Sequence, residues 1–176
     1  PEEGAGSSGP FRGIKATLYE GGIRSPLVVW GPGLVTAAKV GSTNSSSVFS
    51  AIDLVPTLLE IANVSKPAGI DFDGEPLANV LLGSSDKSRE KPLFFRRPPD
   101  RPNHPVEGDL PDLAVRNGKW KLLCEYDGSL PQLYDLIEDC AETSNVAAKH
   151  PKLVDRLARA VHAWHRSMPV AKKETA

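Results

Sequence analysis

The stretch Leu-Ala-Val-Arg-Asn-Gly-Lys-Trp-Lys-Leu-Leu-Cys, residues 113–124, decides the local fold of the second half of the chain. Two apolar-rich runs flank Asn117-Gly118, and an Asn-Gly pair in this position favours a two-residue type I′ turn. We therefore expect an antiparallel β-hairpin here. The short apolar-rich segments at residues 93–96 and 132–136 are predicted to be two further strands.

Two segments have the spacing of amphipathic helices. In residues 54–62 the apolar side chains recur at helical intervals, with Asp53 as the candidate N-cap and Pro56 in the first turn, where proline is tolerated. Asn63 is expected to close this helix in the left-handed conformation. Residues 151–168 show the second pattern and begin with a proline, so we predict a C-terminal helix there.

The apolar run Leu-Val-Val-Trp, residues 27–30, is followed by Gly-Pro-Gly. A continuous apolar run between breakers is typical of a strand that is buried on both faces, so we predict such a strand. Residues 64–92 are rich in Gly and Pro and indicate irregular chain with one short helix near residues 77–82. A charged stretch marks a predicted subdomain boundary near residue 88, and residues 98–111 are expected to form a proline-rich loop.

Composition excludes several classes of protein. The chain has 176 residues, of which 40% are hydrophobic and 24% charged, the proportions of an ordinary globular domain. A net charge of -1 gives no general attraction to nucleic acid or anionic membranes, and no apolar run is long enough to span a bilayer. No set of His, Cys, Asp or Glu has metal-ligand spacing, so no metal site is expected within this chain. The first residues read as the middle of a loop, which indicates that the chain continues upstream.

Residues 13–26 read Gly-Ile-Lys-Ala-Thr-Leu-Tyr-Glu-Gly-Gly-Ile-Arg-Ser-Pro. This segment resembles the second signature of sulfatases of the arylsulfatase type, G-x-K-x-x-x-x-E-G-G-x-R-x-P, and fills every fixed position. Other family patterns follow in order: the D-[LI]-x-P-T-[LI]-L helix at residues 53–59, the [IA]-R-x-G-x-W-K-L hairpin at 114–122 and the L-Y-D-L strand at 133–136. The resemblance covers roughly residues 10–165.

The two cysteines, Cys124 and Cys140, are too few to define a disulfide framework. One bridge between them would need neighbouring strands. The alternative, which we favour, is two separate buried thiols, because free cysteines are commonly buried. Cys140 also stands where the sulfatase pattern usually has a proline, a departure that costs a rigid turn but touches no chemistry.

The resemblance implies an α/β fold. Residues 1–87 would supply the last strand and a flanking helix of a large alkaline-phosphatase-like sheet. Residues 88–176 would form a small antiparallel sheet of about four strands, with the C-terminal helix packed on one face. A first part separated from its sheet would expose apolar surface, so we expect self-association or docking with the missing N-terminal half.

The activity implied by the resemblance is hydrolysis of a sulfate ester, on a sulfated small molecule or sugar, to an alcohol and sulfate. The family's nucleophile is a formylglycine made from Cys or Ser in a C-x-P-S-R-type motif, and neither Cys124 nor Cys140 fits that motif. The calcium-binding aspartates of the family are also absent. We therefore expect formylglycine and Ca²⁺ in the full-length parent, neither of them in this chain, and no turnover by the chain alone. Family membership also suggests an extracytoplasmic location: periplasmic, secreted or lysosomal.

The resemblance assigns one catalytic and substrate-binding residue to this chain, Lys15, as the lysine that binds the sulfate group. An ammonium group is a compact charge with three donors, which suits the oxygens of a sulfate. We interpret Glu20 and Arg24 as scaffold residues that bond to neighbouring backbone or to each other. Gly21 and Gly22 are expected to let the chain bend sharply with positive φ.

Two other functions stay open at this point. One is a phosphodiesterase or phosphonate hydrolase that shares the superfamily's scaffold. The other is a non-catalytic module kept for binding or oligomerisation. The upstream sequence discriminates among them, because a C-x-P-S-R motif supports the sulfatase and another nucleophile supports phosphoryl chemistry.

Overall fold

The computed structural model describes residues 7–97 and 110–169. Its contacts divide the chain into two compact units. The first, which we call the sheet unit, joins the residues up to Arg24 with those from Leu93 onward. The second, which we call the α2 unit, is Ser25–Pro92.

The break between Pro92 and Leu93 lies close to the boundary predicted near residue 88, but the residues up to Arg24 group with the second half of the chain. The signature segment packs with the C-terminal sheet, because Leu18 and Tyr19 share an apolar cluster with residues of the strands. The assignment of the α2 unit to the large sheet of a parent protein stays a prediction. Residues 98–109 of the predicted proline-rich loop lie outside the described residues.

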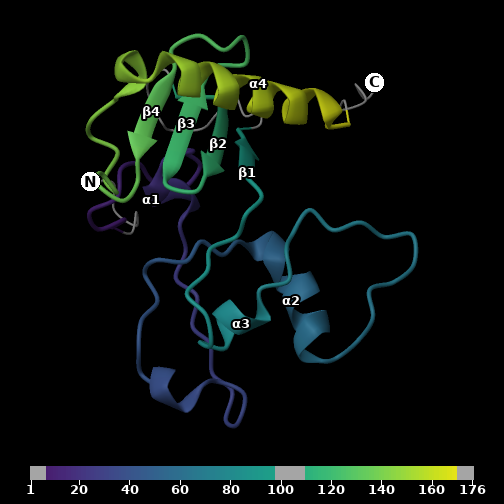
Figure 1. The fold of residues 1–176 in the computed structure, drawn as a ribbon. Helices are drawn as coiled ribbons and strands as arrows, with labels where there is room; N and C mark the ends of the chain where they lie inside the picture. Colours follow the sequence, from purple (N-terminus) through teal and green to yellow (C-terminus); the bar gives the residue numbers. More distant parts are fainter. Residues whose placement is uncertain (1–6, 98–109, 170–176) are drawn as a thin grey trace, which may run out of the picture. The chain divides into compact units, whose positions relative to one another are not determined.

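The sheet unit contains a four-stranded antiparallel sheet in the order β1-β2-β3-β4 (Figure 1). The strands are β1 Leu93–Arg96, β2 Leu113–Asn117, β3 Trp120–Cys124 and β4 Gln132–Asp135. These are the strands predicted from the sequence. A 3₁₀ turn at Ala147–Lys149 precedes the helix α4, Pro151–Ser167, which starts at the predicted proline.

The sheet buries both of its faces. Successive side chains point to opposite faces, since the strand period is two. One face packs under Leu157 and Val161 of α4, and Figure 1 shows that helix crossing the strands. The other face packs on Leu18 and Tyr19, which directly precede the short helix α1, Glu20–Ile23. The signature segment therefore covers one side of the sheet.

The predicted hairpin is present, but its turn lies one residue further along. Asn117 is paired with Trp120, so the two loop residues are Gly118 and Lys119. Gly118 has a φ of 58°, and Lys119 is not among the residues with positive φ. A type I′ turn needs positive φ at both central positions, so the predicted turn type is wrong. Placing glycine first meets the single positive φ without strain.

The α2 unit is mostly irregular chain around two helices, α2 at Leu54–Ile61 and α3 at Ala78–Leu81. Two 3₁₀ turns, Ala37–Lys39 and Ala51–Asp53, complete its regular structure within the described residues. Both predicted helices are confirmed. Asn63 closes α2 with a φ of 52°, as expected for a left-handed cap.

The strand predicted at residues 27–30 is not formed among the described residues. Val28 is 88% exposed and Trp30 is 85% exposed. A strand is stabilised by ladder hydrogen bonds to a neighbour, and no described segment pairs with this one. The apolar pattern is therefore present without the partner that it requires.

The two thiols are separate, as we favoured, but only one of them is buried. Cys124 lies in the core of the sheet, whereas Cys140 is exposed in the loop after β4. Burial raises the pKa of Cys124 to about 11, with the nearby carboxylate of Glu125 adding to the effect.

Across the described residues, no helix is long and apolar enough to cross a membrane.

Candidate functional site

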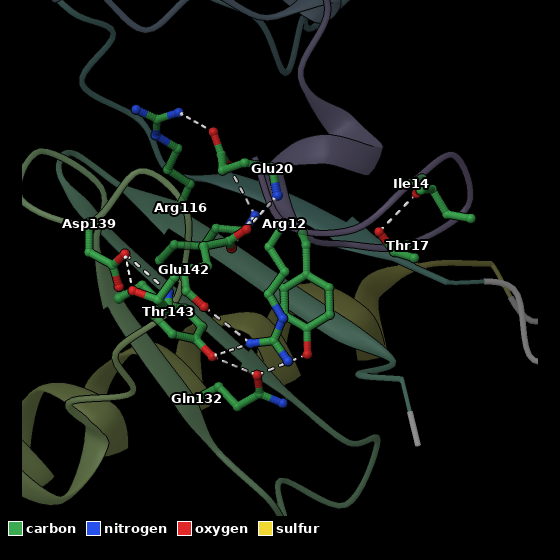
Figure 2. A network of polar contacts seen from close by, with 12 residues as sticks. Arg12, Ile14, Thr17, Glu20, Arg116, Gln132, Asp139, Glu142 and Thr143 are labelled. Carbon is green, nitrogen blue, oxygen red and sulfur yellow. Dashed lines mark hydrogen bonds and ion pairs between the residues drawn. The ribbon is translucent and has the colours of Figure 1, made fainter. Parts of the chain in front are cut away.

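Lys15 lies in a closed loop of the sheet unit. The Gly21 amide donates to the Arg12 carbonyl oxygen over 2.8 Å and closes the base of this loop. Inside it, the backbone N–H and the hydroxyl of Thr17 both donate to the Ile14 carbonyl oxygen, over 3.0 and 2.9 Å (Figure 2). Residues 14–17 therefore form a tight β-turn with Lys15 at its first central position.

The turn has a strained backbone at its second central position. Ala16 has a φ of 77°, a region that non-glycine residues rarely adopt. A positive φ at this position is usual for a type II turn and normally calls for glycine. Such strain costs on the order of 1–3 kcal/mol and persists only where the surroundings over-determine the backbone.

The Lys15 side chain is exposed, and none of the ion pairs among residues 7–97 and 110–169 involves it. A shallow hollow of about 540 Å³ on the same unit is lined by residues 10–12 and 141–143, and Lys15 does not line it. The geometry thus presents a free ammonium group at the tip of a turn. Its role in binding sulfate stays a prediction.

The two glycines of the signature act differently from expectation. Neither Gly21 nor Gly22 has positive φ. They are needed instead because backbone passes close by. A Cβ on Gly21 would lie 2.4 Å from the Gly13 carbonyl oxygen, and one on Gly22 would lie 2.2 Å from the Thr17 carbonyl oxygen. A side chain at either position would collide with these oxygens. Glycine at both positions therefore allows the loop to pack closely against α1.

A buried charge cluster fixes the signature segment to the sheet. Lys121 Nζ on β3 lies 3.0 Å from Glu20 Oε1 and 2.9 Å from Glu142 Oε1. Arg116 Nη1 lies 3.5 Å from the other oxygen of Glu20, as Figure 2 shows. Glu20 is 2% exposed, and Lys121 and Glu142 are fully buried. Glu20 is therefore a scaffold residue, as expected, but its ionic partners lie on the sheet rather than at Arg24.

Burial changes the ionisation of this cluster. Desolvation raises the pKa of Glu142, and the Lys121 ammonium opposes that effect. Desolvation likewise lowers the pKa of Arg116, while the Glu20 carboxylate opposes it. Two carboxylates and two cations together make the cluster close to neutral, which is how buried charges are tolerated.

Sequence reasoning did not identify Lys121 or Glu142 as members of this cluster. A usable signal was present, because Lys121 shares a strand face with Leu123, which belongs to the apolar core below the signature segment. A lysine on a buried face requires an acidic partner. The identity of that partner was not accessible, since Glu20 and Glu142 come from two distant loops.

Polar residues of the D-[LI]-x-P-T-[LI]-L pattern, residues 53–59, have a structural role in the α2 unit. Asp53 is fully buried and pairs with Arg89 at 3.1 Å. Its other oxygen accepts the Glu75 amide over 2.9 Å, and the Thr57 hydroxyl accepts the Leu77 amide over 3.0 Å. These contacts fix the loop before α3.

The described residues do not form a metal site. Within residues 7–97 and 110–169, no group of three or more His, Cys, Asp or Glu side chains could hold an ion. These residues therefore do not fit the calcium ion that the sulfatase resemblance implies for the parent protein.

Comparisons with known proteins agree with the fold and the signature. The family model described as "N-sulphoglucosamine sulphohydrolase, C-terminal" matches residues 11–166. A sulfatase of Formosa agariphila is 32% identical over 155 residues, which are 84% of this chain and 27% of that protein. Human arylsulfatase A is 32% identical over 154 residues, covering 88% of this chain and 28% of its own length.

A solved structure also has a fold similar to that of this chain. It comes from work on glycosaminoglycan metabolism by Bacteroides thetaiotaomicron, and it matches with a TM-score of 0.70 and 26% identity, over 90% of this chain and 32% of that one. The chain spans little more than a quarter of the length of the two curated relatives. The motifs, the fold and the family model coincide over nearly the whole chain, so it belongs to the sulfatase family and corresponds to the C-terminal part of these proteins.

Proposed function

We propose that this chain is the C-terminal part of a sulfuric ester hydrolase and that Lys15 binds the sulfate group of its substrate. The observation that carries the proposal is the free, exposed ammonium at the tip of a strained turn, inside a complete sulfatase signature. Other charged residues of this segment, Glu20 and Arg12, already have partners.

The chemistry explains why a lysine is required. Charge is carried by the sulfate oxygens and builds on the leaving oxygen as the S–O bond breaks. A fixed cation aimed at these oxygens stabilises the transition state, and one such donor is worth about 3 kcal/mol. A tight turn suits this role, because a pre-organised donor needs no reorganisation when the charge develops.

The nucleophile and the calcium ion belong, in this proposal, to the part of the parent protein outside this chain. The chain alone is then inactive. A sulfated sugar is the favoured substrate class, because the matching family model is that of an N-sulphoglucosamine sulphohydrolase and a solved relative concerns glycosaminoglycans.

Substitution of Lys15 in the full-length parent tests the proposal. Lys15→Ala should lower kcat/KM for a sulfate ester about 10²–10³-fold. Its unfolding temperature should not change, because the side chain is exposed. Lys149→Ala, an exposed lysine of the same unit, is the matched control and should leave kcat/KM unchanged. If Lys15→Ala retains full activity, the proposal is wrong.

The substrate class has its own experiment. Sulfated amino sugars and a simple aryl sulfate are compared by kcat/KM with the same enzyme, and the sugar should be preferred. Phosphate diesters serve as the second arm of the panel. Faster hydrolysis of a phosphate diester than of any sulfate ester would favour the phosphodiesterase alternative instead.

A further inference from the structure

Glu142 contacts both ends of the loop that carries Lys15. Its carboxylate Oε2 accepts the backbone amide of Glu20 over 2.6 Å. Its backbone carbonyl accepts the guanidinium of Arg12 over 3.2 Å. Residues 12 and 20 flank the turn, and Figure 2 shows Arg12, Glu20 and Glu142 together. Glu142, in the loop that follows β4, therefore holds both ends of the loop that carries Lys15.

Glu142 is itself held in an unfavourable state. It is fully buried, and its φ of 54° lies in the left-handed region, where a glutamate is strained. Burial raises its pKa, against the pull of Lys121, so keeping it ionised is costly as well. A position that carries both strain and a buried charge has to be stabilised by its neighbours.

The neighbours of Glu142 supply that support. Asp139 Oδ1 accepts the backbone amide of Thr143 over 3.0 Å, and Asp139 Oδ2 accepts the amide of Ser144 over 2.8 Å (Figure 2). Asn145 Oδ1 accepts the Leu133 amide of β4 over 3.0 Å. The loop that presents Glu142 is thus fixed to the rigid sheet on its C-terminal side.

We propose that Glu142 is a positioning residue. It links the loop that carries Lys15 to the four-stranded sheet and so fixes the Lys15 ammonium for sulfate binding. This inference rests on the proposed function of Lys15. A loop closed at residues 12 and 21 and fixed at residues 12 and 20 leaves the turn at residues 14–17 little freedom to move. Misplacement of a catalytic group by about 1 Å can cost about 10²-fold in rate.

A structural role for Glu142 makes a different prediction, and a double-mutant cycle in the full-length parent separates the two. The variants are Lys15→Ala, Glu142→Gln and the double variant. Glutamine keeps the shape and an oxygen for the Glu20 amide but loses the charge that faces Lys121. If Glu142 acts through Lys15, Glu142→Gln should lower kcat/KM at least about tenfold on its own and have no further effect once Lys15 is alanine.

Three results would overturn the inference. Independent effects, in which the double variant falls by the product of the two single losses, would show that Glu142 does not act through Lys15, while the proposed function stands. A Glu142→Gln variant with unchanged kcat/KM would do the same. A neutral Lys15→Ala variant would instead remove the proposed function, and the positioning role with it.

Asp53→Asn provides the matched control for lost stability. Asp53 is an equally buried acid with a cationic partner, but it lies in the α2 unit. Any effect of its substitution on kcat/KM should multiply with that of Lys15→Ala. If Glu142→Gln does not fold, Arg12→Lys replaces it in the cycle. Arg12 is exposed, so that variant should fold, and it should lower kcat/KM several-fold only while Lys15 is present.

Discussion

The sheet unit and the α2 unit bury their apolar residues to very different extents. In the sheet unit Leu122 and Leu133 are fully buried. In the α2 unit Trp30 is 85% exposed and Leu58, on its longest helix, is 54% exposed. The sheet unit thus completes an apolar core from its own segments, whereas the α2 unit is held by polar contacts around Asp53. An apolar surface left open in this way is typical of an interaction site.

The largest effect is expected from the buried charges of the sheet unit. Lys121→Ala removes the cation between the carboxylates of Glu20 and Glu142. Breaking a buried ion pair in this way costs about 3–5 kcal/mol, because it leaves charge uncompensated. The free energy of unfolding is measured by urea titration, followed by the fluorescence of Trp120 and Trp164.

Lys119→Ala is the matched control for that substitution. Lys119 is the turn residue that directly precedes β3, the strand of Lys121. Its side chain is 45% exposed in its pair with Asp135. An exposed pair contributes below about 1 kcal/mol. A loss from Lys121→Ala no greater than that from Lys119→Ala would show that the cluster contributes nothing to the stability of the sheet unit.

Truncation of leucines tests the packing difference directly. Leu122→Ala should destabilise the sheet unit by about 2–5 kcal/mol, because a fully buried leucine leaves a cavity. Leu58→Ala in the α2 unit should cost below about 0.5 kcal/mol in this chain, since over half of its surface is exposed. Urea unfolding of both variants gives the comparison. Equal losses would mean that Leu58 is covered in solution.

Local signals explain which parts of the fold could be predicted. The four strands of the sheet and the helix α4 were predicted correctly, because their periodicity and breakers lie within a few residues of each other. The turn at Gly118 was misplaced by one residue, since register also depends on which residues of the two strands pair. The exposed run at residues 27–30 has the pattern of a strand but lacks a partner among the described residues.

The candidate site was predictable only in part. Lys15 came from a contiguous motif, whereas the residues that fix its loop are brought together by the tertiary fold. The amide of Glu20 and the carboxylate of Glu142 are 122 residues apart in sequence. No local pattern encodes such a pairing. The motif therefore indicated Lys15 as the candidate for substrate binding, and the structure identified the residues that hold its loop.

A smaller effect is expected on association. Val28 and Trp30 are among the most exposed apolar side chains of the described chain. If they cause this chain to associate with itself, the double variant Val28→Ser, Trp30→Ser should shift it toward monomer in sedimentation velocity. Val115→Ser in the sheet unit is the contrasting substitution. It should unfold the unit rather than reduce association, because Val115 is fully buried.

The smallest effect is expected from surface ion pairs, of which each unit contains its own. The hydrogen bond from Lys119 holds the pKa of Asp135 below its ordinary value of 3.8. A depressed folded-state pKa gives stability that is present above pH 3.8 and is lost as the pH falls through the folded pKa. Asp135→Asn should therefore cost below about 1 kcal/mol at neutral pH and flatten the acid limb of the stability curve.

The corresponding pair in the α2 unit is Lys66 with Asp71, whose carboxylate is fully exposed. Lys66 lowers the pKa of Asp71 in the same direction. Because solvent screens this pair more completely, Asp71→Asn should leave the acid limb unchanged in urea titrations at successive pH values. A pH effect of Asp71→Asn as large as that of Asp135→Asn would place Asp71 in a less exposed setting. The α2 unit would then be better packed in solution than its exposed apolar residues indicate.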